Sequence, residues 1–183
     1  MFGIDGLLYI PNYISETQHN DLMLAINAQA WLGTLSRRTQ HYGYVYNYRA
    51  RNIDPNMYLG PLPSWLTPIA NQLVIDQLMP INADQAIINE YEAGQGIAAH
   101  IDCEPCFGDV VVSLSLGSAA MMDFTYEKQK VSVFLEPRSL VVLQDDARYV
   151  WKHGIAARKS DVINDKRVPR GRRVSTTFRT VNV

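Results

Sequence analysis

The second half of the chain is a series of short apolar runs that are separated by turn residues. From Ala86 onward these runs are AIINEY, VVVSLSL, AAMMDF, VSVFL, SLVVL, ARYVW and VSTTFRTV. The segments between them, such as GQG, LGS and EPRS, favour turns. Many short strands at this spacing predict an antiparallel sandwich or barrel of the jelly-roll kind.

Helical signals are confined to the first half of the chain. Ser15 followed by Gln18 is a capping box, which predicts a helix through about Ala30. A second helix is expected from Ser64 as the N-cap, with Pro68 in its first turn. The expected fold class is therefore α+β, and mainly β.

The length of 183 residues is most simply explained by one domain. Within it we expect N-terminal helices over residues 1–85 and a jelly-roll core over residues 86–183. No apolar run approaches the roughly 18 residues of a membrane span. The N-terminus lacks the basic residues of a signal peptide. We expect a cytoplasmic monomer without membrane contact, and a nuclear or organellar location stays open.

The basic residues are unevenly distributed, although the net charge is only −1. All 17 Lys and Arg residues lie within 37–51 and 128–179. Seven of them fall within 158–173 against two acids. These segments predict a polyanion-binding face if the fold brings them together. The alternative is a solvated loop that happens to be basic.

Four tyrosines alternate along RRTQHYGYVYNYRARNID, namely Tyr42, Tyr44, Tyr46 and Tyr48. On a strand all four rings would share one face. Arginines flank them on both sides, at Arg37, Arg38, Arg49 and Arg51. Aromatic rings can stack on unpaired bases while guanidinium groups hold phosphates. An aromatic strand that packs on the core is the alternative, and the sequence leaves both open.

Cys103 and Cys106 form a C-x-x-C unit. A zinc site would need a second ligand pair, and a thioredoxin-type motif would need a βαβ context. Neither is present, so we expect two reduced thiols in a loop. In an oxidising compartment the two could still pair.

His100 and Asp102 are two residues apart, so on a strand both side chains leave the same face. A second histidine, His153, would complete a set of two imidazoles and one carboxylate. Such a set holds Fe(II) on one side and leaves positions open for substrate and oxygen. The pattern predicts a mononuclear iron oxygenase.

The last strand supplies a possible cosubstrate site. Arg173, Ser175, Thr177 and Arg179 alternate, so they point to one face of the strand. Two cations on an inward face require anions, and a small diacid between them supplies carboxylates. A metal triad beside a carboxylate clamp is the layout of a 2-oxoglutarate-dependent dioxygenase.

Taken together, N-x-Y-(x8)-H-x-D, the later H-G-I and the final R-x5-R resemble the AlkB family of Fe(II)/2-oxoglutarate dioxygenases. The resemblance implies a double-stranded β-helix with an N-terminal substrate-recognition lid, and O2 as the oxidant. It implies Fe(II) on His100, Asp102 and His153. It also implies 2-oxoglutarate contacts from Asn89, Tyr91, Arg173, Ser175 and Arg179. Ser175 stands where some members have asparagine.

Within that family the chain is most similar to the branch that hydroxylates carboxymethyl-type wobble uridines in tRNA. Small members of the family include enzymes that demethylate alkylated bases. The resemblance therefore implies hydroxylation or oxidative demethylation of a flipped or unpaired base. Candidate substrate contacts are Arg38, Tyr42, Tyr44, Tyr46, Glu104 and Arg148. A protein or small-molecule substrate, and a binding module with a vestigial metal site, are the alternatives.

Arg148, five residues before His153, has more than one possible role. It could contact the substrate or donate hydrogen bonds behind the metal ligands. An ion pair with Asp145 or Asp146 is a third interpretation.

Overall fold

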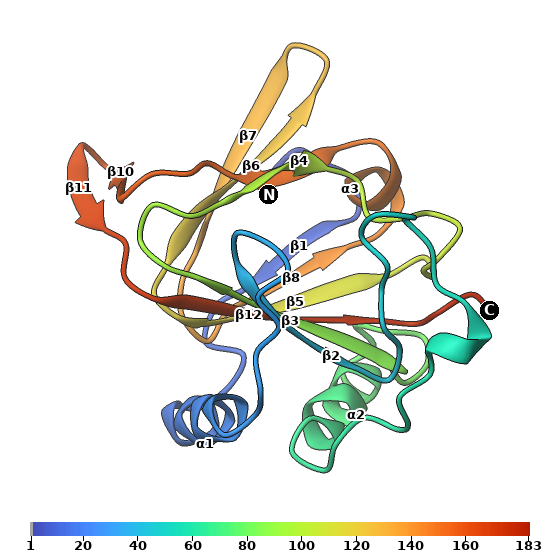
Figure 1. Cartoon of the computed structure of the whole chain (residues 1–183). Helices are drawn as coiled ribbons and strands as arrows, with labels where there is room; N and C mark the ends of the chain where they lie inside the picture. Colours follow the sequence, from blue (N-terminus) through green and yellow to red (C-terminus); the bar gives the residue numbers. More distant parts are fainter. Residues whose placement is uncertain (1) are drawn as a thin grey trace.

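The computed structural model describes residues 2–183 and consists mainly of two antiparallel β-sheets that face each other (Figure 1). The larger sheet has six strands. In spatial order these are β1 (Leu7–Ile10), β8 (Leu140–Leu143), β5 (Val111–Gly117), β12 (Arg173–Arg179), β3 (Gln85–Tyr91) and β2 (Arg38–Tyr42). This architecture confirms the predicted jelly roll.

The smaller sheet has four strands and lies over the inner face of the larger one. Its spatial order is β4 (Ile97–His100), β9 (Lys152–Ile155), β6 (Ala120–Tyr126) and β7 (Gln129–Leu135). A separate hairpin, β10 (Ser160–Ile163) with β11 (Lys166–Pro169), projects at one side (Figure 1).

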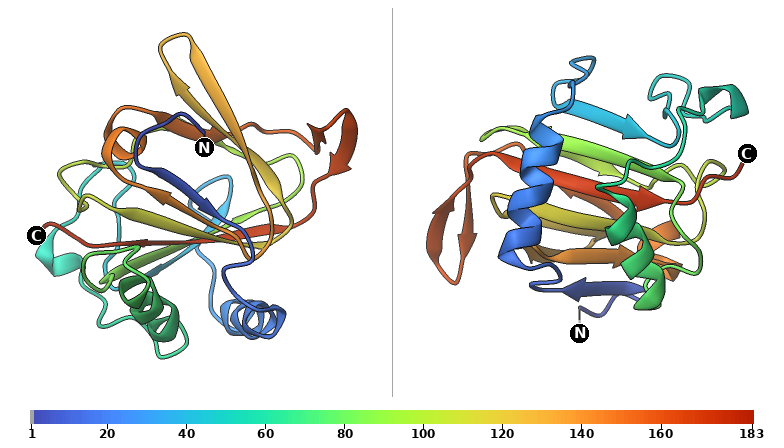
Figure 2. Two further views of the ribbon diagram at one scale, coloured as in Figure 1. Left: turned by 180° about the vertical axis from the view of Figure 1, so that it is seen from behind. Right: turned by 90° about the horizontal axis from the view of Figure 1, so that it is seen from below.

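Two helices cover the outer face of the six-stranded sheet, α1 (Glu16–Asn27) and α2 (Thr67–Ile75) (Figure 2). Alternate residues of the central strand β12, such as Val174 and Phe178, pack into the core beneath these helices. The alternate set, Arg173, Ser175, Thr177 and Arg179, faces the smaller sheet. The period of two along β12 thus separates a helix-covered apolar core from a polar inner face.

Both helix predictions are confirmed in type, with differences at the ends. The Ser15 hydroxyl accepts a hydrogen bond from the Gln18 amide at 3.1 Å, and the Gln18 side chain accepts one in return. This capping box opens α1, which ends at Asn27 rather than near Ala30. Helix α2 has Leu66 rather than Ser64 as its N-cap.

The prediction of a strand at ARYVW is wrong. That region forms the short helix α3 (Asp145–Tyr149), and strand β9 begins only at Lys152. The neighbouring residues Ala147 and Arg148 are both buried, which a strand with one buried face does not allow. A short apolar run does not distinguish a helix from a strand by its periodicity.

The prediction that four tyrosines share one strand face is also wrong. Strand β2 ends at Tyr42, and the next residue, Gly43, has φ +76°. A Cβ atom at Gly43 would lie 1.7 Å from the Asp84 carbonyl oxygen, so only glycine fits there. The chain therefore leaves the sheet and forms a loop over residues 43–60, which we call the lid. It contains one 3-10 turn, η1 (Pro55–Met57).

Two further findings concern the first half of the chain. Strands β1 and β2 precede residue 86 yet belong to the six-stranded sheet, so this sheet takes strands from both predicted parts of the domain. Among residues 2–183, no helix is long and apolar enough to cross a membrane.

Candidate active site

The three predicted metal ligands meet between the two sheets. His100 ends β4, and His153 lies directly opposite it on β9. Their ring centroids are 4.5 Å apart. An Asp102 oxygen, Oδ1, lies 3.4 Å from His100 Nε2 and 3.9 Å from His153 Nε2. All three potential ligand atoms fall within 4.8 Å of one another.

Hydrogen bonds and burial prepare these groups for a cation. His100 Nδ1 lies 2.8 Å from the Ala98 carbonyl oxygen, to which it donates, so Nε2 remains available as a ligand. Burial lowers the pKa of His153 to about 4, which keeps its imidazole neutral at pH 7. Burial opposes ionisation of Asp102, yet Arg179 and the two histidines lower the pKa of Asp102 well below its ordinary range.

The donor set fits Fe(II). Two neutral imidazoles and one ionised carboxylate are the ligands of the non-haem iron oxygenases. Arg179 Nε donates to Asp102 Oδ2 at 2.8 Å, so that the other carboxylate oxygen, Oδ1, faces the histidines. All three ligands are supplied by one side of the cavity, by β4, the residue two beyond its end, and β9.

A buried cation lies deeper in the same cavity. Arg173 is 3% exposed, and its Nη2 donates to the Ser115 hydroxyl at 3.0 Å. Its guanidinium carbon lies 5.7 Å from the Tyr91 ring centre. No carboxylate pairs with Arg173, and its Nε has no hydrogen-bond partner within residues 2–183. Burial lowers the pKa of Arg173. An unpaired buried charge of this kind fits an anionic ligand such as a 2-oxoglutarate carboxylate.

The other predicted cosubstrate contacts line the same cavity, namely Asn89, Tyr91, Ser175 and Arg179. Register explains why they meet, since Arg173 pairs with Tyr91 and Ser175 with Asn89 on neighbouring strands. Residues that face each other across two antiparallel strands share one face. The two arginines differ in their hydrogen-bond partners, because Arg179 donates to the Asp102 carboxylate whereas Arg173, among residues 2–183, donates to a neutral hydroxyl.

Above the triad lies an open groove with a volume of about 430 Å³. Its walls include aromatic and basic side chains, namely Arg37, Tyr46, Tyr48, Arg51, Phe107 and Arg179. Among the described residues that line it, Asp102 is the one acidic side chain, and Arg179 already pairs with it. The groove is therefore an aromatic and cationic entrance to the metal site.

The aromatic rings of the groove are positioned by contacts between the lid and the sheet. His41 Nδ1 accepts a hydrogen bond from the Tyr46 amide at 3.1 Å. The Tyr46 ring lies 5.0 Å from Tyr48 and 5.6 Å from Phe107, measured between ring centres. The Arg37 guanidinium lies 5.6 Å from the Tyr48 ring centre, and its Nε donates to Asn89 at 2.7 Å.

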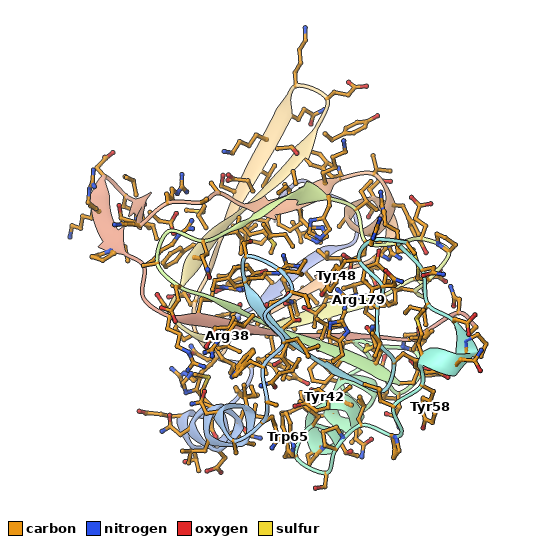
Figure 3. The ribbon with its side chains drawn as sticks, viewed as in Figure 1. Arg38, Tyr42, Tyr48, Tyr58, Trp65 and Arg179 are labelled. Carbon is orange, nitrogen blue, oxygen red and sulfur yellow. A yellow bond between two sulfur atoms is a disulfide. The ribbon has the colours of Figure 1, made fainter. Side chains whose placement is uncertain are left out.

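Of the six predicted substrate contacts, the structure brings only Tyr46 to the groove. Arg38 and Tyr42 leave the other face of β2, toward the helices, where they contact Glu90 and Trp65 (Figure 3). Successive side chains of a strand point to opposite faces, so Arg38 and Tyr42 share one face of β2 while His41 points inward from the other.

The remaining three predicted contacts also lie elsewhere. The Tyr44 ring lies 4.9 Å from the Tyr58 ring, away from the metal site. Glu104 is exposed and does not line the groove. Arg148 is buried and does not line the groove, and its guanidinium donates to the Asp102 carbonyl oxygen rather than to Asp145 or Asp146.

Sequence reasoning placed several groove residues outside the candidate site. Tyr48 continues the alternating tyrosine pattern, and Arg37 and Arg51 belong to the first basic segment, so these signals could have found them. Phe107 carries no such signal. Its position depends on how the lid and the loop after Asp102 pack against each other.

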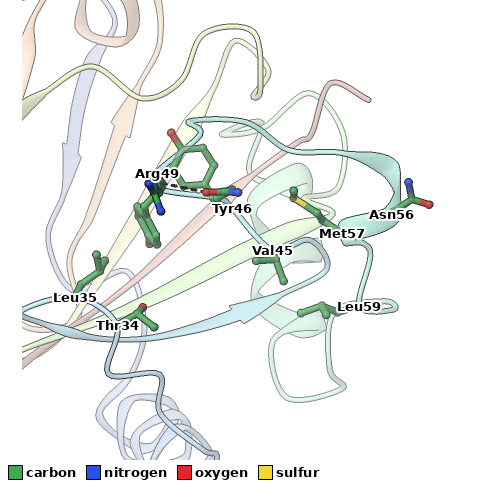
Figure 4. Close-up of a pocket in the computed structure, with 10 residues that line it drawn as sticks. Thr34, Leu35, Val45, Tyr46, Arg49, Asn56, Met57 and Leu59 are labelled. Atoms are coloured by element: carbon green, nitrogen blue, oxygen red, sulfur yellow. Dashed lines mark hydrogen bonds between the residues drawn. The ribbon is translucent and has the colours of Figure 1, made fainter.

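A second hollow, of about 720 Å³, lies on the other side of the lid tyrosines (Figure 4). Tyr46 and Tyr48 line both this hollow and the groove. The rest of its wall is apolar at four residues and polar at four, namely Leu35, Val45, Met57 and Leu59, and Thr34, Asn47, Arg49 and Asn56. The two tyrosines thus form a partition between the hollows.

The two basic segments meet at Glu90. Its carboxylate accepts hydrogen bonds from Arg38 of the first segment and Arg172 of the second. In the hairpin region, Asp161 pairs with Arg158 and Arg170. The fold therefore meets the condition that the two segments come together, but carboxylates neutralise part of their charge. Exposed bases remain on the hairpin at Lys159, Lys166 and Arg167.

The expectation of two reduced thiols is wrong for this structure. Cys103 and Cys106 are joined by a disulfide, in the loop that follows Asp102. Both residues are buried against Phe107, with Tyr46 and Ile53 of the lid beside them. The Cys106 amide donates to the Cys103 carbonyl oxygen, and this turn places the two Cα atoms 5.3 Å apart, within the range of a disulfide.

Comparisons with known proteins agree with this geometry. The sequence pattern of the 2OG-Fe(II) oxygenase superfamily matches residues 24–179. An Arabidopsis thaliana protein named alkylated DNA repair protein ALKBH8 homolog is 36% identical over 98% of this chain and 59% of its own length. The Mus musculus tRNA (carboxymethyluridine(34)-5-O)-methyltransferase ALKBH8 is 38% identical over 86% of this chain and 25% of its own length.

The chain thus spans about three fifths of the plant relative and a quarter of the mouse relative. Among solved structures, that of OsALKBH1 superposes with a TM-score of 0.70 and covers 96% of both chains at 18% identity. That structural similarity shows a shared fold.

Proposed function

This chain belongs to the AlkB branch of the 2OG-Fe(II) oxygenase superfamily, and we propose that it oxidises a substituent of a base in nucleic acid. It is a 2-oxoglutarate- and Fe(II)-dependent dioxygenase with His100, Asp102 and His153 as its metal triad. The first candidate substrate is a modified wobble uridine of tRNA. An alkylated base in DNA or RNA is the second.

The composition of the groove is the observation that carries the proposal. Tyr46, Tyr48 and Phe107 offer ring surfaces within reach of the metal site. Arg37 and Arg51 add positive charge, and neither forms an ion pair with a carboxylate within residues 2–183. Stacking surfaces with adjacent cations suit an unpaired base and its phosphates better than they suit a peptide.

Fe(II) and 2-oxoglutarate supply, together with O2, the oxidation of a C–H bond, with succinate and carbon dioxide as co-products. The chain's own residues prepare this chemistry. Asp102 stays ionised and His153 stays neutral, as metal ligands must. Arg173 would hold the distal carboxylate of the cosubstrate, and its burial excludes competing water.

The base must be unpaired or turned out of its helix to reach this depth. In the proposed complex it stacks on Tyr48 in the groove. The neighbouring nucleotide lies in the hollow on the other side of the tyrosine partition. Arg49 lines that hollow and would meet a phosphate there.

The preference for a wobble uridine rests on charge and on the relatives. The mouse relative is named for carboxymethyluridine, whose substituent is anionic. An anionic substituent would pair with Arg51, which is exposed at the groove wall. We therefore propose a carboxymethyl-type uridine rather than a neutral methylated base as the preferred substrate.

The test is to measure succinate release, with mass spectrometry of the nucleosides, across a matched substrate panel. The panel contains a tRNA with carboxymethyluridine at the wobble position, its methyl ester, its unmodified form, N-methylated single-stranded DNA and a peptide. We expect the carboxymethyl form to stimulate succinate release most and to gain one oxygen atom. His100→Ala is the control for background turnover.

Two outcomes would contradict the proposal at different levels. Equal use of the acid and its methyl ester would remove the charge argument but leave a nucleic-acid substrate. Stimulation by the peptide alone would remove the nucleic-acid substrate itself. Arg51→Met should reduce the difference in succinate release between the acid and the ester substrate. Arg167→Met, on the exposed hairpin, should leave this difference unchanged.

A further inference from the structure

Arg148 is the largest of the fully buried side chains, at 2% exposure, and it lies in α3 and does not line the groove. No ion pair joins it to a carboxylate within residues 2–183. This is unusual, because a buried charge normally requires an opposite charge nearby. Backbone carbonyl oxygens take the place of a carboxylate as the hydrogen-bond partners of Arg148.

Four backbone carbonyl oxygens surround the guanidinium. Arg148 Nη1 lies 3.0 Å from the Asp102 oxygen, and Nη2 lies 3.4 Å from the Cys103 and Phe107 oxygens. Arg148 Nε lies 3.3 Å from the Gly108 oxygen. All four acceptors belong to one segment, residues 102–108, which we call the ligand loop.

The ligand loop joins the metal centre to the groove. Asp102 begins the loop and is the carboxylate ligand, while Phe107 near its end forms part of the groove wall. Phe107 lies 4.7 Å below the Arg179 guanidinium, and Arg179 donates to Asp102 Oδ2. Asp102 is therefore held from two directions, by Arg179 through its side chain and by Arg148 through its backbone.

Only arginine can make this set of contacts. Its guanidinium is planar and carries five N–H donors that point in different directions, so one side chain can bind several carbonyls. Lysine has three donors on one nitrogen atom and would satisfy fewer of them. Within residues 2–183 the Asp102, Phe107 and Gly108 oxygens accept no other hydrogen bond, whereas the Cys103 oxygen also accepts from the Cys106 and Phe107 amides.

We propose that Arg148 is a positioning residue that fixes the ligand loop and thereby the affinity and geometry of the metal site. Arg148 does not itself line the substrate groove, and it makes no hydrogen bond to the donor atoms of the metal ligands. Its effect passes through the backbone of Asp102. The inference concerns the metal centre and does not depend on which substrate the enzyme oxidises.

The test measures binding of Co(II) to the metal-free protein, with the visible absorption of bound cobalt as the readout. Loss of an outer contact to a metal ligand typically weakens metal binding by about 10–100-fold. We expect a weakening in this range for Arg148→Met, with an altered cobalt spectrum. Arg148→Lys should recover part of the affinity, because it keeps the charge and some of the donors.

Arg170→Met is the matched control. Arg170 is also a buried arginine, but it pairs with Asp161 and the Ala156 carbonyl, in the hairpin region. Its loss should lower the melting temperature while the cobalt affinity stays within about twofold of wild type. Wild-type cobalt affinity and spectrum in Arg148→Met would overturn the proposal. If Arg148→Met does not fold, an unchanged cobalt spectrum in Arg148→Lys would overturn it equally.

Discussion

The inner cavity and the outer groove both border the metal triad, but they are built from different parts of the chain. The cavity takes its polar side chains from regular strands, with Asn89 on β3, His153 on β9 and Arg173 on β12. The groove takes its walls from the lid and the ligand loop, as with Tyr48 and Phe107. Strands fix side-chain direction by period, whereas loops depend on tertiary packing. The side chains that determine the reaction are therefore fixed more rigidly than the side chains that determine the substrate.

The largest expected effect comes from removing a metal ligand in the strand-built region. His100→Ala should weaken metal binding beyond the roughly 100-fold range of outer contacts and abolish 2-oxoglutarate turnover. The measurement is succinate release with saturating cosubstrate. His19→Ala is the control, since His19 lies on α1, where its ring bonds to Asn20 and to the Gly117 amide and not to the metal ligands. Retained turnover in His100→Ala would refute the ligand assignment.

The next effect concerns the cosubstrate. Arg173→Met removes the unpaired cation of the cavity, and loss of one partner of a buried charge pair costs about 2–5 kcal/mol. We expect 2-oxoglutarate affinity to fall by at least about 30-fold, measured by calorimetry with the redox-inert Zn(II) in the site. Arg172→Met is the neighbouring control, because its side chain points to the other face and pairs with Glu90. Similar losses in both variants would contradict the assignment.

The third effect tests the loop-built region alone. Tyr48→Ala should raise the KM for nucleic acid by about tenfold, since base stacking on an aromatic ring contributes about 1–3 kcal/mol. The affinity for 2-oxoglutarate should stay unchanged in this variant. Tyr58→Ala, which removes an exposed ring outside the groove, should alter neither quantity. If Tyr48→Ala changed the affinity for 2-oxoglutarate and left the KM for nucleic acid unchanged, the assignment of Tyr48 to the substrate groove would be contradicted.

The smallest effect concerns how the lid is held. Burial, then Arg179 and Arg37, lower the pKa of His41 from 6.5 to about 4. As the pH falls, His41 therefore takes up a proton near pH 6.5 in the unfolded chain but only near pH 4 in the folded chain. His41 should leave stability unchanged above about pH 7 and reduce it progressively between about pH 6.5 and 4.

The measurement is the free energy of unfolding against pH for the metal-free wild type and for His41→Gln. Glutamine keeps an acceptor for the Tyr46 amide but does not titrate. Other titrating groups, His153 included, act in both proteins and cancel in the difference. The difference should change between pH 6.5 and 4, whereas parallel curves would contradict the lowered pKa.

The same contrast explains what the sequence could predict. Arg173, Ser175, Thr177 and Arg179 share a face because the chain there is a regular strand, so simple alternation was sufficient. The same reasoning gave a wrong prediction for the four tyrosines, because the left-handed backbone at Gly43 ends the strand after Tyr42. Alternation in the sequence does not reveal where a strand stops.

The ligand loop illustrates a second limit. His100 and Asp102 were identified from their spacing, although Asp102 lies beyond the end of β4 rather than on it. Arg148 could not be assigned, because its partners are backbone carbonyls and these have no signature in a sequence. Phe107 likewise reaches the groove through tertiary packing. Such contacts emerge only when the chain is folded.

The central claim is that the cavity holds Fe(II) and 2-oxoglutarate together, and one measurement tests it most directly. Fe(II) and 2-oxoglutarate are added without oxygen to the metal-free protein, and the visible absorption spectrum is recorded. The account predicts a weak charge-transfer band that requires both components and disappears in His100→Ala. A wild-type spectrum without this band, from folded protein with both components in excess, would contradict it.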